Sequence, residues 1–255
     1  MRAVLATSRA AFLEAAANRG ALASQMTVMI VNDGVWIVFW AIFFRRTGPL
    51  AGWDLDTIIV LQAVLTAAGG IALGLVANAR RIGPLALDGG LDPVLTLPTS
   101  TLGHVLARRV EPVNLGDLAF GVVLFAVAAH PTPARVALFG VVVLASATLM
   151  VGFLVLTGSL AFFAGRGEAG ELGFHAMVLL GSYPVDIFAG TAKLVLYTVV
   201  PAAFVATVPA RLIEHFDAGQ AAALVGIAGA VALAAALVFR AGLRRYESGA
   251  VWTRA

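Results

Sequence analysis

Six long apolar stretches, separated by short polar intervals, dominate the sequence. They lie at about 24–44, 56–77, 114–129, 137–163, 174–204 and 220–239. A helix needs about 20 apolar residues to cross the hydrocarbon core of a bilayer. The pattern therefore predicts an all-α polytopic membrane protein with six transmembrane helices, in which residues 1–255 form a single transmembrane domain.

The first twenty residues differ from these stretches, because four charged side chains interrupt them: Arg2, Arg9, Glu14 and Arg19. No apolar core of signal-peptide length is left between the charges. The larger apolar side chains fall near one helical face: Val4, Leu5, Phe12 and Ala16. We predict an amphipathic helix over 2–18, lying in the membrane interface within the N-terminal segment 1–20.

The fifth apolar stretch is too long for one straight span and contains two prolines, Pro184 and Pro201. Pro184 removes a helix hydrogen bond and favours a kink at Tyr183. Asp186 and Lys193 would share a face of a continuous helix, but their spacing is too long for a direct i, i+4 pair. The stretch can form one span with a re-entrant piece, or two spans.

Charge placement chooses between these two options, because the side of a membrane protein richer in Lys and Arg is normally cytoplasmic. With six crossings and a cytoplasmic N-terminus, twelve arginines lie inside and four outside. The inner arginines are Arg2, Arg9, Arg19, Arg80, Arg81, Arg108, Arg109, Arg166, Arg240, Arg244, Arg245 and Arg254, and the outer ones are Arg45, Arg46, Arg135 and Arg211. A seventh crossing would give eight on each side. We therefore predict a broken, re-entrant fifth span and two cytoplasmic termini.

Composition agrees with a membrane protein, since 60% of the residues are hydrophobic and 12% are charged, against about 25% charged residues in soluble domains. A net charge of +3 could suggest a nucleic-acid partner, but arginine excess in a membrane protein more often sets orientation. We predict no nucleic-acid partner. The chain has no cysteine, which excludes disulfides and thiolate metal sites.

The longest polar interval, 79–112, is predicted to be a cytoplasmic loop. Gly89 and Gly90 favour a turn, after which Asp92 is a good N-cap with a proline at the first helical position. Pro98 ends this helix, and Thr99 or Ser100 can cap a second one. The second helix has an apolar side, Leu102, Val105, Leu106 and Val110, and a polar side, His104, Arg108 and Arg109. The interval is either a helical hairpin with a function at the inner membrane face or a plain connector.

Ionisable residues within the spans are candidates for a transport path, since each costs about 2.5–3.5 kcal/mol at mid-bilayer on insertion scales. The candidate path residues are Asn32, Asp33, Trp36, Tyr183, Asp186 and Lys193. The structural alternative is that Asp33 neutralises Lys193 or caps a kink. Asp117, near the cytoplasmic end of the third span, can reach water or Arg109.

Motifs for chemistry are absent from the sequence. The only lysine, Lys193, lies in GTAKLVL and not in a GxxxxGK[ST] phosphate loop, so the chain is not an ATPase of that type. There is no HExxH helix, and six-span topology separates the four histidines. Gly158-Ser159 does not complete a GxSxG elbow. Small residues at helix-packing spacing, Gly70 with Gly74 and Gly226 with Ala230, permit dimerisation without predicting it.

Four short motifs in order along the chain resemble those of the short bacterial ABC-2 transporter permeases. They are Gly90-Leu91-Asp92 followed by Leu95, Leu97 and Pro98; Tyr183-Pro184 followed by Phe188; Pro201-Ala202-Ala203-Phe204 with Pro209-Ala210; and Arg244-Arg245-Tyr246-Glu247-Ser248. The resemblance covers nearly the whole chain. It implies the membrane half of an ATP-driven exporter in a bacterial inner membrane, paired with a second permease, identical or homologous, and with two copies of an ABC ATPase.

By this resemblance, the loop at about 84–98 is the coupling helix that docks into the ATPase, with the N-terminal helix beside it. The implied coupling residues are Leu85, Leu87, Asp88, Leu91, Asp92, Leu95 and Leu97. The broken fifth span would close the outer end of the pathway. ATP and Mg would bind the partner, so this chain would hold no cofactor. The apolar spans suit a hydrophobic or amphipathic cargo, such as a drug or a lipid.

Two other classes remain possible on the residues alone. An ion-coupled secondary carrier would use Asp33 and Lys193 as ion sites, although such carriers usually contain paired broken helices and only one span here is interrupted. An intramembrane enzyme would need a catalytic constellation that the sequence does not provide.

Overall fold

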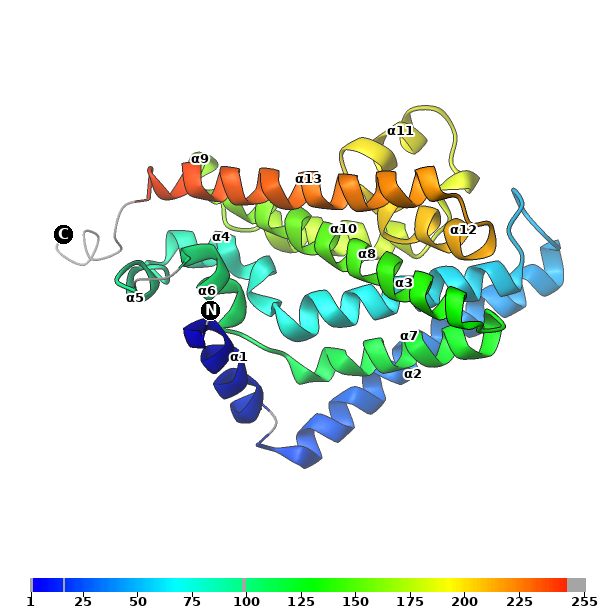
Figure 1. Cartoon of the computed structure of the whole chain (residues 1–255), viewed down its shortest axis with the longest axis horizontal. Helices are drawn as coiled ribbons and strands as arrows, with labels where there is room; N and C mark the ends of the chain where they lie inside the picture. Colours follow the sequence, from blue (N-terminus) through cyan, green and yellow to red (C-terminus); the bar gives the residue numbers. More distant parts are fainter. Residues whose placement is uncertain (1, 16, 98–99, 247–255) are drawn as a thin grey trace.

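Helices account for most of the chain in the computed structural model, which describes residues 2–15, 17–97 and 100–246 (Figure 1). The long apolar helices are α2 (Arg19–Thr47), α3 (Leu55–Leu75), α7 (Leu115–Ala128), α8 (Pro133–Ser159), α10 (Ala169–Gly181) and α13 (Ala218–Leu243). The remaining elements are α1 (Arg2–Ala15), η1 (Ala77–Arg81), α4 (Ile82–Leu87), α5 (Asp92–Leu95), α6 (Thr101–Ala107), η2 (Pro112–Asn114), α9 (Ala161–Ala164), η3 (Val185–Ile187), α11 (Gly190–Thr198), η4 (Ala203–Thr207) and α12 (Val208–Glu214).

Length and apolarity allow four helical segments to cross a membrane: α2, α3, α8 continued into α9, and α13. The number rises to six if each of two bent helix pairs is one span. One pair joins α6 to α7 at 74°, and the other joins α11 to the η4–α12 segment at 71°. The all-α polytopic class is therefore confirmed.

The fifth apolar stretch is broken, as predicted, but its break divides it into more pieces than one kink would. Helix α10 starts before the stretch, at Ala169, and ends at Gly181. Extended backbone at Pro184 and Phe188 flanks η3, and α11 then turns back before η4, a single π-helical segment, leads into α12. A chain bent at several places cannot continue α10 along its axis.

The bundle has two ends of different make-up (Figure 1). We call the end with α1, α4, α5, α6, α9 and the last turn of α13 the α1 end, and the end with α11, α12 and the α2–α3 and α7–α8 turns the α11 end. Among the described residues, eleven arginines lie at the α1 end: Arg2, Arg9, Arg19, Arg80, Arg81, Arg108, Arg109, Arg166, Arg240, Arg244 and Arg245. The other four, Arg45, Arg46, Arg135 and Arg211, lie at the α11 end. The predicted division of charge thus corresponds to two opposite ends of the bundle.

Helix α3 is the centre of the core and packs mainly on α7 and α8. Asp54 and Thr57 form a reciprocal capping box at its start. A Cβ added to Gly70 would lie 2.4 Å from the backbone nitrogen of Leu118, so only glycine lets α7 approach this closely. Gly70 and Gly74 therefore serve packing within the chain, whereas Gly226 has open space around it.

Helix α1 packs against α6, where the Ser8 hydroxyl donates to the carbonyl of Ala107 over 3.3 Å. The predicted N-terminal helix is thus present over Arg2–Ala15, with residues 17 and 18 outside it, and it lies beside the loop between α3 and α7. Of its predicted apolar face, Phe12 lies against this loop. The side chains of Val4, Leu5 and Ala16 are outside the described residues.

Candidate functional site

The loop between α3 and α7 is not a plain connector, because its described residues form three short α-helices, α4, α5 and α6, between the 3₁₀ segments η1 and η2. Helix α4 was not predicted, since Gly83 and Pro84 argue against a helix, yet a proline in the first turn needs no intrahelical partner for its missing N–H. A Cβ on Gly83 would lie 2.3 Å from the carbonyl oxygen of Gly167. Helix α4 is therefore seated directly on the backbone that precedes α10.

The turn after α4 leads into α5 with a different role for Asp92 than predicted. Gly89 has φ +72°, which confirms the predicted turn. Helix α5 starts at Asp92 itself, and no side chain caps it. Instead, the Asp92 carboxylate accepts a 2.7 Å hydrogen bond from the Tyr246 hydroxyl, beyond the end of α13. Burial and the nearby Asp92 carboxylate raise the pKa of Tyr246 to about 12, so the hydroxyl remains a donor at neutral pH.

The implied coupling residues divide into a fixed base and an exposed tip. Leu91 is fully buried, Asp92 is bonded to Tyr246, and Leu85 is half-buried. The other four have exposed side chains: Leu87, Asp88, Leu95 and Leu97. Only these four, which we call the loop tip, are available to a docking partner. Pro98 and Thr99, predicted to end one helix and cap the next, lie outside the described residues.

The predicted second helix of the loop is present as α6, but it ends at Ala107, so Arg108, Arg109 and Val110 follow the helix instead of lying on it. The Ser100 hydroxyl accepts a hydrogen bond from the Gly103 amide, as expected of an N-cap. Val105 and Val110 are buried, whereas Arg108 and Arg109 are exposed. The Asn78 side-chain amide donates to the carbonyl of Val105 over 2.8 Å, which fastens α6 to the end of α3.

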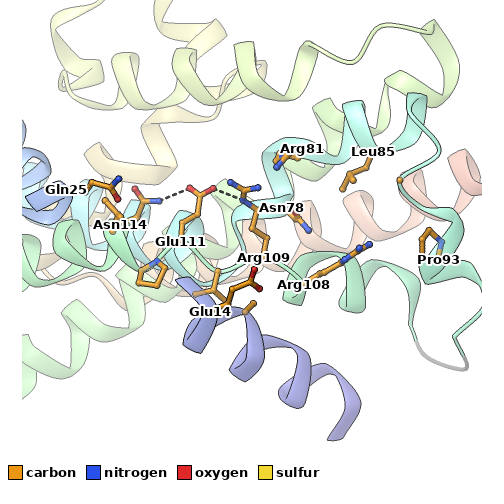
Figure 2. Close-up of a pocket in the computed structure, with 15 residues that line it drawn as sticks. Glu14, Gln25, Asn78, Arg81, Leu85, Pro93, Arg108, Arg109, Glu111 and Asn114 are labelled. Carbon is orange, nitrogen blue, oxygen red and sulfur yellow. Dashed lines mark hydrogen bonds and ion pairs between the residues drawn. The ribbon is translucent and has the colours of Figure 1, made fainter. Parts of the chain in front are cut away.

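A cavity of about 920 Å³ opens between α1 and this loop (Figure 2). We call it the arginine chamber, after its lining residues Arg81, Arg108 and Arg109; Glu14, Gln25, Asn78, Glu111 and Asn114 also line it. Glu111 organises one wall, since its carboxylate binds Arg109 at 2.8 Å and Arg80 at 2.9 Å. The sequence analysis did not find this network, because it depends on Arg80 of η1 lying against the link between α6 and η2 that holds Arg109 and Glu111.

The candidate path residues Asp186 and Lys193 meet at the α11 end. The Lys193 ammonium donates to Asp186 Oδ1 over 3.1 Å, which the break between η3 and α11 makes possible. The expectation that their spacing prevents a direct pair is therefore wrong. The other oxygen, Oδ2, accepts from the Trp53 indole over 3.1 Å and from Arg211 over 3.5 Å, and this guanidinium also lies 4.1 Å from the Trp53 ring.

Helix α2 contributes the other candidates. Trp36 and Tyr183 are in edge-to-face contact, with ring centroids 5.7 Å apart, so the structure brings these two together. Asn32 is exposed, and Asp33 lies on the same helix one turn before Trp36. Both structural roles suggested for Asp33 are wrong: Asp186 neutralises Lys193, and α2 runs unbroken through residue 33.

Asp117 on α7 was expected to reach water or Arg109 and does neither. Its side chain is buried, and Arg109 is paired with Glu111. Within the described residues, one oxygen of Asp117 and one of Asp33 are buried without a hydrogen-bond partner. Helices α2 and α7 pack together, and the two carboxylates are close enough to interact electrostatically. No group of three or more His, Cys, Asp or Glu residues among the described residues could hold a metal ion.

Comparison with known proteins decides the family. The profile of the ABC-2 family transporter proteins matches residues 30–250. The chain belongs to the ABC-2 transporter family. No curated protein and no solved structure matches it.

As an ABC-2 permease, the chain is a multi-pass membrane subunit of an ABC transporter, and it associates with an ABC ATPase. This role agrees with a chain that has apolar helices and no phosphate loop. The matched segment includes the whole loop between α3 and α7. The loop tip and the arginine chamber, apart from the wall formed by α1 and Gln25, therefore lie within the part of the chain that matches the family.

Proposed function

We propose that this permease moves a hydrophobic or amphipathic small molecule or lipid outwards, using ATP that a separate ABC ATPase binds with Mg and hydrolyses. The whole chain acts as one transmembrane unit and holds no cofactor. The observation that carries the proposal is the loop tip, which presents Leu87, Asp88, Leu95 and Leu97 from a base fixed by Leu91, Asp92 and Gly83. A rigid base under an exposed apolar tip suits the transfer of motion from a partner.

The orientation follows from the division of arginines between the two ends, since the richer end is expected in the cytoplasm. The α1 end and both termini would then be cytoplasmic, in a bacterial inner membrane. The natural absence of cysteine allows a direct test. Asp88→Cys should react with a membrane-impermeant thiol reagent only in inside-out vesicles, and Leu50→Cys only in right-side-out ones. The opposite result would overturn the assignment.

The exposed apolar side of α2 supports pairing with a second permease, either a copy or a homologous chain. Several of its side chains are largely exposed: Val28, Val31, Val35, Val38 and Ile42. The pathway would run between the permeases, past Asn32 and Trp36, and the α11 segment held by Asp186 would close its outer end. Two permeases would bind two ATPase copies, one at each loop tip.

The coupling role is tested by breaking α5, with a second variant at the same position that removes the side chain but keeps the helix. Asp92→Pro is a poor choice, because proline fits the first position of a helix. In Leu95→Pro the chain loses the 3.1 Å hydrogen bond from this amide to the Leu91 carbonyl. We expect normal insertion but loss of substrate-stimulated ATPase activity in the copurified complex, with Leu95→Ala as the control. Unchanged stimulation in Leu95→Pro would contradict the proposal.

One observation favours a second candidate, an ion-coupled carrier. The unpartnered carboxylate oxygens of Asp33 and Asp117 are where a proton or cation could bind, whereas Lys193 is already paired with Asp186. A carrier would transport cargo into proteoliposomes with a proton gradient and no ATP, and Asp33→Asn would abolish this transport. An ATP-driven exporter would require the ATPase subunit and ATP.

A further inference from the structure

Three arginines around α1 and the loop have no acidic partner among the described residues. Arg9, Arg81 and Arg108 form no ion pair with any described residue, and all three have exposed side chains. Arg109 is paired with Glu111, whose charge Arg80 also neutralises. Glu14 is the one remaining acid lining the arginine chamber. The chamber and its mouth therefore carry an excess of positive charge.

Two apolar cavities lie beside the chamber, one after the other. The first, about 530 Å³, meets the chamber at Val110 and is lined on its other sides by Phe12, Leu75 and Leu106, with Arg9 at its edge. The second, about 360 Å³, shares Val76 and Leu106 with the first. It passes between α3, α6, α8 and α13, where it is lined by Leu102, Leu144 and Val151 among others. We call the two together the apolar groove.

We propose that the arginine chamber and the apolar groove bind one anionic phospholipid, with its phosphate among Arg81, Arg108 and Arg109 and one acyl chain along the groove. A charged space that lies beside an apolar one, with Val110 lining both, matches the two parts of an amphiphile. An arginine guanidinium can donate two parallel hydrogen bonds to phosphate oxygens. The groove would remove an acyl chain from water, which is favourable for an apolar group. The site requires only a multi-pass membrane protein and is independent of the proposed ATP coupling.

The position of α1 makes this ligand more suitable than a soluble anion. Helix α1 lines both spaces, since Glu14 faces the chamber and Arg9 and Phe12 line the groove. The Ser8–Ala107 hydrogen bond fastens this helix to the chain at the end of α6. A free phosphate would leave the apolar groove unused. A docked ATPase would meet the loop tip first, because Leu87 and Leu95 are exposed and do not line the chamber.

The test is native mass spectrometry of the full chain, with any subunit that copurifies, released from mild detergent and titrated with dioleoylphosphatidylglycerol or dioleoylphosphatidylcholine. We expect a preference of about tenfold for the anionic lipid, since each arginine near a charged headgroup contributes several-fold. Arg81→Gln with Arg108→Gln should abolish the preference. The matched control, Arg45→Gln with Arg46→Gln, removes two exposed arginines from the α11 end and should keep it.

Two further measurements separate lipid from ion. Leu106→Ser should weaken binding of both phospholipids by a similar factor, because it alters the wall that the two cavities share, and inorganic phosphate should not compete with the anionic lipid. The proposal is overturned if the double Gln variant binds like the wild type, if the α11-end control loses the preference equally, or if inorganic phosphate displaces the lipid. It is also overturned if a copurified ATPase subunit fills the chamber and excludes the lipid.

Discussion

The two ends of the bundle use positive charge in opposite ways. At the α11 end, the cations that lie against other elements are engaged: Lys193 and Arg211 both bind Asp186, and Arg135 binds Glu214 at 3.6 Å. At the α1 end, Arg9, Arg81 and Arg108 have no ion-pair partner among the described residues, and the loop tip exposes leucines. The difference is that the α11 end uses its cations for contacts within the chain, whereas the α1 end leaves cations and apolar side chains accessible, as the proposed docking and lipid binding require.

The largest effect is expected from a substitution that disrupts the base of the loop at the α1 end. In Gly83→Ala, the new Cβ would lie 2.3 Å from the Gly167 carbonyl oxygen, so backbone must move, at a cost of about 3 kcal/mol. Thermal unfolding in detergent measures the loss. The matched control is Gly140→Ala on α8, where a Cβ meets nothing within 4 Å. This control should be neutral or stabilise by about 0.5–1 kcal/mol. Equal behaviour of the two variants would show that α4 is not seated on this backbone.

The second prediction compares how the same substitution of one exposed leucine at each end changes the binding of the ATPase. Leu95→Asp at the loop tip should weaken binding of the ATPase about thirtyfold, the scale of an interface hot spot. Leu50→Asp, of equal exposure but in the α2–α3 turn, should leave binding unchanged. Affinity of the purified permease for its ATPase is the measurement. If both variants bind normally, the loop tip is not the docking surface.

The third prediction concerns the ion pairs that Asp186 forms at the α11 end. Asp186→Asn would leave Lys193 and Arg211 close together without their shared anion, which should lower stability by about 1–2 kcal/mol. Hydrogen exchange should accelerate in α11 while α5 and α6 are unaffected. Asp56→Asn, an exposed carboxylate in the first turn of α3, is the control and should cost less than about 1 kcal/mol. Unchanged exchange in α11 would show that Asp186 does not hold this segment.

The smallest expected effect concerns the bond between α5 and the chain after α13. Tyr246→Phe removes the 2.7 Å hydrogen bond to Asp92 and keeps the ring against Phe162, so stability should fall by about 1 kcal/mol or less. If this bond holds the loop tip in place, substrate-stimulated ATPase activity should fall clearly even though the free energy of unfolding changes little. Tyr197→Phe on α11 is the control, because its hydroxyl makes no such bond. If Tyr246→Phe keeps the wild-type level of substrate-stimulated ATPase activity, the hydrogen bond contributes to stability only.

The apolar pattern predicted the spans well, because lipid demands long apolar helices whatever their packing. The third stretch, for example, was expected at 114–129 and forms a helix over Leu115–Ala128. Helix α4 was missed because its start, Gly83-Pro84, is unfavourable in isolation and is compensated by close packing on Gly167.

The sites were less predictable than the spans. The charged residues within the fifth stretch were found, but their pairing depended on a chain reversal that no periodicity reveals. The Glu111 network and the bond between Asp92 and Tyr246 join residues far apart in the sequence. Such contacts follow from tertiary packing, so the residues could be named as candidates but their partners could not.

The close contact of α3 with α7 at Gly70 has a mechanical consequence. The loop tip leaves the bundle from α3 and returns to it through α7, and the Glu111 amide donates to the Gly74 carbonyl at the point of return. The two helices that the loop connects, α3 and α7, are thus packed into one rigid unit. If a partner ATPase displaces the loop tip, as proposed above, α3 and α7 are therefore expected to move together as one rigid unit.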